Sequence, residues 1–234
     1  MENTETKKIL GSVIAIIPAR GGSKRLPGKN LLPLNGMPLI AHSIIAAQLC
    51  RYIDRCIVST EDPEIKETAL SYGAEVIDRP AQLAEDHITT RQVINYLLVN
   101  LLPALPDYFV LLQPTSPLRS GAQVTRCLEL FTVNIARSAV SVTGLNCHPY
   151  KTVIAKDGSL HGTAGQQYLD QPDQNLPPAY ALNGAIYLTP CRLFLKQGSF
   201  FIHPVMPYIM DQRSSIDINT LEDLKNAATY SSIQ

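Results

Sequence analysis

The stretch VIAIIPARGGSKRLPGKN, residues 13–30, joins a short apolar run to a loop rich in glycine and cations. The unbroken run 13–17 is typical of a strand buried on both faces of a sheet. Three glycines in the loop let the backbone turn tightly and bring N–H groups toward an anion. The loop cations are Arg20, Lys24, Arg25 and Lys29. Backbone donors and cations together predict a polyphosphate site.

The loop lacks the two common nucleotide-binding motifs. No G-x-x-x-x-G-K-[ST] register fits, because Lys29 is followed by Asn30, and G-x-G-x-x-G is absent. The sequence therefore contains no motif that would support an ATPase or a dinucleotide-binding protein. A solvated basic turn is the alternative, but the position directly after a buried first strand favours a functional loop.

Strands and helices alternate on either side of this loop. Strands are expected at 13–17, 56–59, 74–77, 108–113 and 138–143, and helices at 39–49, 64–72, 89–99 and 121–133. This alternation predicts an α/β, Rossmann-like fold with an open, mostly parallel sheet and helices on both faces. Ligands of such sheets bind outside the carboxyl ends of the strands. The loops at that edge begin at Pro18, Ser59, Asp78 and Pro114.

The alternation breaks after residue 143. Residues 148–178 are rich in Pro, Gly, Gln and Asp, with weak strand signals and a turn at Asp157-Gly158. We expect a single domain, 1–234, with a small insertion arm at about 145–180. A strand at 185–188 and a last helix at 221–228 complete the fold, and Asn219 or Thr220 caps that helix.

Composition narrows the function classes. The 20 basic and 20 acidic side chains balance, and no basic tract appears, so nucleic acid is not an expected partner. Five irregularly spaced cysteines fit no disulfide or zinc framework, which favours a reducing cytoplasm. Residues 1–8 are polar, the run 13–17 is too short for a signal peptide, and prolines interrupt the apolar stretch 96–112. We expect a soluble, cytoplasmic protein with no membrane partner.

Five motifs follow one another along nearly the whole chain. They are IPARGGSKRLPGKN at 17–30, Arg79-Pro80 with Asp86, LQPTSPLR at 112–119, NGAIY at 183–187 and SIDINT at 215–220. Together they resemble the acylneuraminate cytidylyltransferases, the CMP-sialic acid synthetase family. The resemblance implies a nucleotidyltransferase that moves CMP from CTP to the anomeric hydroxyl of a nine-carbon α-keto acid sugar, such as N-acetylneuraminate or legionaminate, and releases pyrophosphate.

The resemblance assigns the nucleotide contacts. Arg20 and Lys29 would be catalytic, because fixed cations stabilise the charge that gathers on the departing pyrophosphate. The CTP-binding set is Arg20, Ser23, Lys24, Lys29, Asn30, Arg79, Asp86 and Thr90. Arg79 would read the acceptor edge of cytosine, since a guanidinium only donates; an exposed turn arginine is the alternative. Asp86 and Thr90 fit an N-capping role nearly as well.

The acceptor side is also implied by the resemblance. Its sugar-binding set is Gln113, Ser116, Lys151, Tyr180, Asn183, Phe200 and Phe201. Core packing explains Phe201 equally well. Arg119 either pairs with a carboxylate or is a surface residue at a helix start. In relatives, part of the arm reaches a second subunit, which implies a homodimer.

The family carries Asp-x-Asp before the last helix to hold Mg²⁺ (or Mn²⁺) on the phosphates. Here the motif is Asp217-Ile218-Asn219. In an extended segment both polar side chains point the same way, so both would face one metal. Asn219 offers a neutral oxygen and should weaken the site, so Asp217, assigned to catalysis as well, is the main expected ligand.

A second departure concerns the acceptor. Many relatives carry an arginine in a stretch like R-Q-D-L-P, whereas residues 173–178 read DQNLPP. The hypothesis that follows is an acceptor other than N-acetylneuraminate, such as legionaminic or pseudaminic acid.

A cytidylyltransferase for the eight-carbon acid Kdo is the nearest alternative. A CTP-binding protein without catalysis and a purely structural domain are the others. Either a metal-bound water or an aspartate could deprotonate the hydroxyl.

Overall fold

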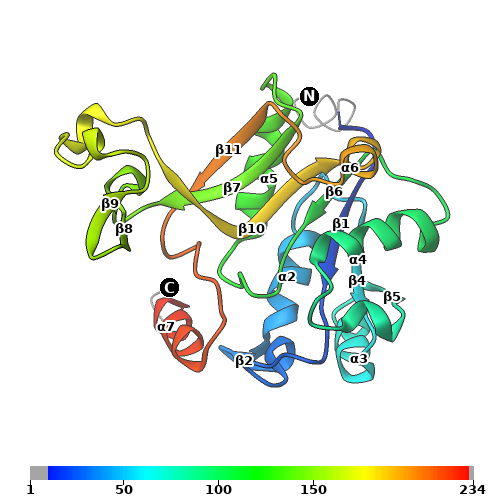
Figure 1. Cartoon of the computed structure of the whole chain (residues 1–234). Coiled ribbons are helices and arrows are strands. Elements are labelled where there is room, and N and C mark those ends of the chain that lie inside the picture. The colour runs from blue at the N-terminus through cyan, green and yellow to red at the C-terminus, as the bar shows by residue number, and fades with distance from the viewer. Residues whose placement is uncertain (1–9, 232–234) are drawn as a thin grey trace.

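An open sheet of seven strands forms the centre of the computed structural model, which describes residues 10–231 (Figure 1). The polar stretch 1–8 lies outside the described residues. The strand order is β11-β7-β10-β6-β1-β4-β5. The strands are β1 (Val13–Pro18), β4 (Arg55–Thr60), β5 (Glu75–Asp78), β6 (Tyr108–Leu111), β7 (Ser138–Gly144), β10 (Tyr180–Pro190) and β11 (Val205–Met210).

Neighbouring strands run parallel except at β10, which is antiparallel to both β6 and β7. The predicted α/β fold with a mostly parallel sheet is therefore confirmed. The central strands β1, β4 and β6 are almost wholly buried, as their apolar runs predict.

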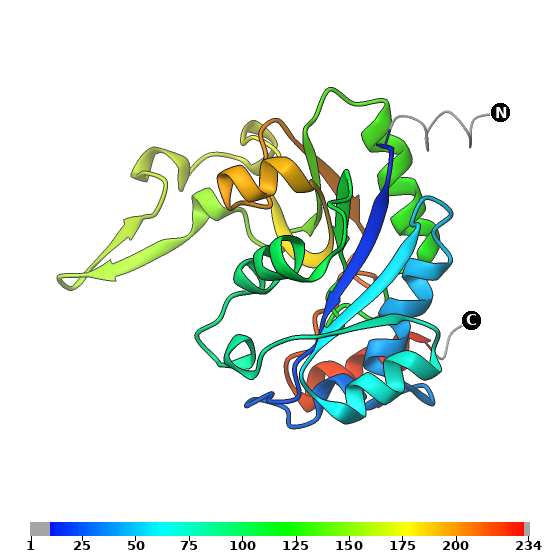
Figure 2. The same cartoon turned by 90° about the vertical axis from the view of Figure 1, so that its right-hand side faces the viewer.

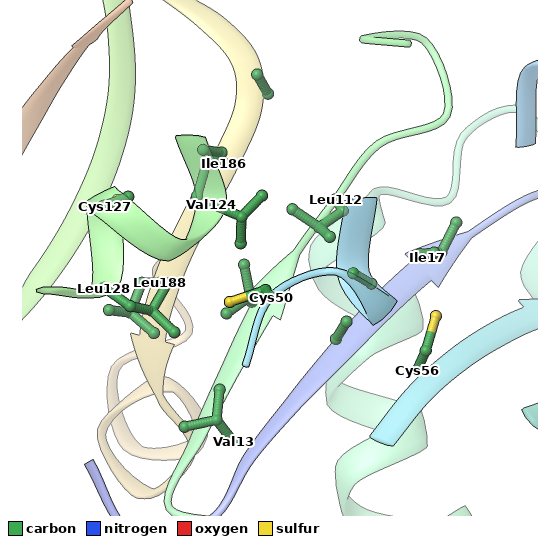
Figure 3. Close-up of a cluster of buried hydrophobic side chains, with 14 of the residues drawn as sticks. Val13, Ile17, Cys50, Cys56, Leu112, Val124, Cys127, Leu128, Ile186 and Leu188 are labelled. Atoms are coloured by element: carbon green, nitrogen blue, oxygen red, sulfur yellow. The ribbon is translucent and has the colours of Figure 1, made fainter. Parts of the chain in front are cut away.

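Helices cover both faces of the sheet (Figure 2). They are α2 (Leu39–Gln48), α3 (Pro63–Ser71), α4 (Thr90–Tyr96), α5 (Gly121–Thr132), α6 (Cys191–Gln197) and α7 (Leu221–Ser231). Successive residues of a strand face opposite ways. Val13, Ala15 and Ile17 of β1 join a cluster with α2, α3 and α5 (Figure 3), while Ile14 and Ile16 join another with α4 and α6. Over residues 10–231, none of the helices has the length and apolar character needed to cross a membrane.

Polar caps begin several helices where the sequence predicts. Asp62 accepts hydrogen bonds from the first free N–H groups of α3. Ser120 and Gln123 form a capping box at α5. At α7, Thr220 N donates to Asp223 Oδ2 at 2.8 Å and Asp223 N donates back to Thr220 Oγ1 at 3.2 Å. These reciprocal bonds fix where each helix starts.

The fourth helix differs from its prediction. Thr89 caps α4, so the capping alternative for Asp86 and Thr90 is wrong. The helix expected over 89–99 is α-helical only to Tyr96 and continues as a π-helical turn, Leu97–Leu101. Asp86 and Thr90 are thereby free of a capping role at the edge where the strands end.

The expected arm contains a two-stranded hairpin. Strands β8 (Val153–Lys156) and β9 (Ser159–Gly162) pair antiparallel around Asp157 and Gly158, whose φ angles are 51° and 73°. Both views show the hairpin extending away from the central sheet (Figures 1 and 2). The remaining short elements are β2 (Pro33–Leu34), β3 (Met37–Pro38) and the 3₁₀ turns Lys29–Leu31, Ala81–Ala84, Pro149–Lys151, Gln166–Tyr168 and Asp173–Asn175.

A third apolar cluster joins the first loop to the end of the chain. Leu26, Leu34 and Leu39 pack against Ile218 and Ala227. Burial of these side chains stabilises the contact between two segments that are far apart in sequence. The glycine-rich loop and the segment before α7 therefore lie side by side.

Candidate active site

A pocket of about 260 Å³ opens where the parallel strands end. The loops after β1, β5 and β6 and the start of α4 form its walls. Seven predicted site residues line it: Arg20, Lys29, Asn30, Arg79, Asp86, Thr90 and Gln113. The fold therefore brings most of the predicted nucleotide set together at the edge where open α/β sheets bind ligands.

A second hollow of about 360 Å³ follows the glycine-rich loop itself. Gly21, Gly22, Ser23 and Lys24 lie on one side, and Glu85 and Asp86 on the other. The two acids also line the first pocket, so the two hollows adjoin. The backbone of the glycine-rich loop therefore lies next to the pocket that gathers the predicted nucleotide contacts.

Asp86 contacts the loop cations directly. Its carboxylate lies 3.0 Å from Arg20 Nη1 and forms a second ion pair with Lys24. The hydrogen bond from Lys24 lowers the pKa of Asp86 below its ordinary value. Arg20 also donates to the carbonyl of Ala84 at 3.2 Å. As an acceptor-only group, Asp86 orients the cations and cannot itself donate to a phosphate.

Lys29 connects the first loop with the segment before α7. The backbone reaches it through Gly28, whose φ of 64° lies in the left-handed region. Its Nζ donates to the carbonyl of Ile218 at 3.0 Å and to Asn219 Oδ1 at 3.4 Å. Burial lowers the pKa of Lys29, and the charge of Asp217 partly opposes that shift. The ammonium is thus fixed between the pocket and the Asp-x-Asn motif.

The Asp-x-Asn motif offers a single carboxylate. Asn219 Nδ2 donates to Asp217 Oδ2 at 2.6 Å, while the other amide atom, Oδ1, accepts from Lys29. The capping alternative for the Asn219 side chain is wrong, because Thr220 and Asp223 cap α7. Within residues 10–231, no three His, Cys, Asp or Glu side chains lie close enough to hold a metal by themselves.

Arg79 is buried rather than exposed, with 7% of its surface accessible, so the exposed-turn alternative is wrong. Its Nε donates to Glu61 Oε2 at 2.8 Å, and its Nη2 lies 2.7 Å from the same oxygen. Glu61 was not identified from the sequence. Its position directly after a buried strand, at the edge expected to bind ligands, is the signal that could have found it.

The predicted sugar-binding residues are more dispersed. Gln113 lines the pocket, but Ser116 is fully buried, with Oγ 3.5 Å from the carbonyl of Asn183. The Asn183 side chain accepts from Ser141 Oγ at 2.5 Å and donates to Ser215 Oγ at 2.8 Å. These bonds tie β7, β10 and the segment before α7 together, so Asn183 supports the site from within.

Four other acceptor candidates lie off the pocket wall. Phe200 packs against Phe194, with ring centroids 5.2 Å apart. Phe201 stays partly exposed beside Tyr187. Lys151 pairs with Asp173 at 2.5 Å inside the arm, and Tyr180 begins β10 with an exposed ring. Their sugar-binding roles stay predictions.

Arg119 differs from both of its interpretations. It is fully buried and donates to the carbonyl of Ala185 at 3.0 Å and to Ser43 Oγ at 2.7 Å. Burial lowers its pKa to about 9. Within residues 10–231 no carboxylate pairs with it, so it fastens α2, β10 and the loop after β6 to one another.

An open α/β sheet with a cationic glycine loop and a buried arginine at its ligand edge is the arrangement expected of a nucleotidyltransferase. Residues 14–159 match the family model described as Cytidylyltransferase, and the chain belongs to this family. This confirms the expected enzyme class.

Two relatives and one solved structure agree with this assignment. The CMP-N,N'-diacetyllegionaminic acid synthase of Legionella pneumophila is 36% identical over 217 residues, covering 89% of this chain and 91% of the relative. The N-acylneuraminate cytidylyltransferase of Escherichia coli is also 36% identical, over 93% of this chain, which spans about half (51%) of that relative. The structure of CMP:2-keto-3-deoxy-manno-octonic acid synthetase complexed with CTP superposes with a TM-score of 0.71 over 95% of this chain and 99% of that chain, at 17% identity. This last likeness supports the fold.

Proposed function

We propose that the protein transfers CMP from CTP to the anomeric hydroxyl of a nonulosonic acid and releases pyrophosphate. The observation that carries the proposal is the pocket that gathers Arg20, Lys29 and Arg79 in a chain that belongs to the cytidylyltransferases. Relatives whose names specify legionaminic and acylneuraminic acids support the class of acceptor.

The proposed reaction is an in-line substitution at the α-phosphorus. The anomeric oxygen forms a bond to phosphorus, the bond to the bridging oxygen of pyrophosphate breaks, and the hydroxyl proton leaves to water or a nearby carboxylate. Arg20 and Lys29 would stabilise the charge on the departing pyrophosphate. Arg79 would orient the base, and the rigid Gln113-Pro114 turn would place the acceptor.

We also propose Mg²⁺ (or Mn²⁺) as cofactor. The donor set fits a weak protein site: Asp217 is one exposed carboxylate, and the neutral Asn219 next to it turns its amide nitrogen to Asp217 and its oxygen to Lys29. Mg²⁺ commonly uses one or two carboxylates, with substrate phosphates and waters as the other ligands. When bound, the metal would neutralise phosphate charge.

The acceptor is proposed to be a diamino nonulosonic acid of the legionaminic type, from residues 173–178 and the Legionella relative. The test is a pyrophosphate-release assay that crosses the four nucleoside triphosphates with N-acetylneuraminate, legionaminate, pseudaminate and Kdo. Release with CTP and legionaminate is expected. A preference for N-acetylneuraminate would reject legionaminate as the acceptor, and a preference for Kdo would reject the nine-carbon class of sugar. Binding of CTP without any pyrophosphate release would reject catalysis. A preference for ATP or UTP would reject cytosine as the base.

A single domain with a dimerising arm is part of the proposal. Val153, Ile154 and Leu160 are exposed apolar side chains on the hairpin, and Leu182 of β10 and Ile209 of β11 are exposed as well. Exposed apolar side chains gathered on one element often mark an interaction surface. We propose a homodimer in which this hairpin packs against the second copy.

A cytoplasmic location is proposed because all five cysteines are free thiols and four are buried.

Leu160→Asp is expected to weaken the dimer at least about tenfold, because it places a charge in the apolar contact. Sedimentation equilibrium of the full chain measures the effect. Ile135→Asp is the matched control, since Ile135 is 92% exposed on the connection after α5, outside the hairpin. A Leu160→Asp protein that dimerises like the wild type would contradict the proposed contact.

A further inference from the structure

Glu61 holds two separate parts of the site with its two carboxylate oxygens. Oε1 accepts from the backbone N–H of Gly21 at 2.8 Å, and Oε2 accepts from Arg79 Nε at 2.8 Å. Gly21 follows β1, Glu61 follows β4 and Arg79 follows β5, and these three strands are neighbours in the sheet. One side chain therefore joins the carboxyl ends of three parallel strands.

The guanidinium of Arg79 has little freedom to leave this contact. Its side chain is 4% exposed and that of Glu61 is 18% exposed. Within residues 10–231, no acceptor is well aligned with the buried Nη2, although it lies 2.7 Å from Glu61 Oε2. Arg79 also lines the 260 Å³ pocket. Glu61 thus occupies one edge of the guanidinium and leaves donors on the opposite edge for a ligand.

The contact with Gly21 extends this restraint to the phosphate loop. A Cβ at Gly21 would lie 2.1 Å from Asp62 Oδ2, so the loop passes tightly against the start of α3. Glu61 and Asp62 therefore fix the first glycine of the loop, and neither side chain lines the two hollows. The base-reading arginine and the phosphate loop share one anchor.

We infer that Glu61 is a positioning residue that sets the preference for cytosine over uracil by fixing the Arg79 donors; this rests on the proposed function. Cytosine presents two acceptors, O2 and N3, whereas uracil presents a donor, N3–H, at the second position. If the donors of Arg79 cannot move, the N3–H of uracil points at an N–H of Arg79, and that buried donor of Arg79 has no acceptor. Sites that require a hydrogen-bond partner discriminate strongly against a base that lacks it.

Glu61→Gln tests the inference. The amide keeps an oxygen for one contact but loses the charge and the second acceptor, so Arg79 gains freedom. We expect the ratio of kcat/KM for CTP to that for UTP to fall at least about tenfold. Glu75→Gln is the matched control, because Arg55 and Glu75 form another arginine–glutamate pair between β4 and β5, at the amino ends of these strands, away from the site and at the exposed surface. Its ratio should equal that of the wild type.

Two further variants separate positioning from folding. Glu61→Asp keeps the charge on a shorter side chain, and should lower the ratio even if Glu61→Gln fails to fold by its thermal melt. In an Arg79→Met background, Glu61→Gln should cause no further loss of the ratio, because the effect acts through Arg79. The inference would be overturned if folded Glu61→Asp kept the wild-type ratio of kcat/KM for CTP to that for UTP. It would also be overturned if Glu61→Gln lowered this ratio as much in the Arg79→Met background as in the wild type. A wild-type enzyme that ignores CTP would instead overturn the proposed function.

Discussion

Lys29→Met is expected to lower kcat/KM for CTP by about 10²–10³-fold while the protein remains folded. The ammonium is held by the carbonyl of Ile218 and by Asn219, so it is fixed before substrate arrives. A fixed cation stabilises the charge that develops on pyrophosphate without reorganisation during the reaction. Methionine keeps the apolar stem and removes only the charged end. Steady-state pyrophosphate release measures the loss, and a thermal melt measures folding.

Lys24→Met is the control from the same loop. The Lys24 side chain is 80% exposed and its ion pair is with Asp86, so water screens much of its charge. We expect a loss below about tenfold, because a solvated cation contributes little charge stabilisation. If Lys29→Met retained near-normal activity, or if both variants lost equally, the fixed ammonium would have no special part in the reaction.

The fold was predictable wherever local signals agree. The apolar runs of β1 and β6 predict buried strands, and Asp62 and Ser120 mark helix starts because each satisfies free N–H groups. β11 and α6 were not predicted. Pro207 interrupts the pattern of β11, which an edge strand tolerates, and α6 begins after Pro190 without a side-chain cap. The antiparallel entry of β10 between β6 and β7 depends on long-range packing, which no local pattern encodes.

The site residues also differ in whether a local sequence pattern or only the tertiary structure reveals them. Lys29 and Arg20 could be located because a cationic loop after a buried strand is a local feature. The position of Glu61 at the ligand edge was open to the same reasoning, but its role was not, because that role depends on β4 lying between β1 and β5. A glutamate beside a helix cap otherwise resembles a solvated acid. Arg119 shows the converse: an arginine at a helix start looks exposed, yet tertiary packing buries it completely.

The segment before α7 shows how one substitution in a motif changes a prediction. With aspartate at both positions, two carboxylates would face Lys29 and a metal. Here Asn219 uses its amide to bind Asp217 on one side and Lys29 on the other. The amide of Asn219 carries no charge, so Asp217 supplies the negative charge of the motif. The proposed metal should therefore depend on this one carboxylate and on the phosphates of CTP.

Asp217→Asn is accordingly expected to reduce kcat/KM by about 10²-fold at ordinary Mg²⁺ levels and to recover partly as Mg²⁺ is raised. The variant leaves two neutral amides in the motif and removes its only charged ligand. Mn²⁺ binding in the presence of CTP, followed by electron paramagnetic resonance, gives a readout independent of turnover and should weaken by about 10–100-fold. Asn219→Asp is the matched change in the opposite direction, and should tighten Mn²⁺ binding because it adds a second carboxylate. Equal Mn²⁺ affinity in the wild type and both variants would show that the metal is held elsewhere, and Asp217 would then lose its proposed role.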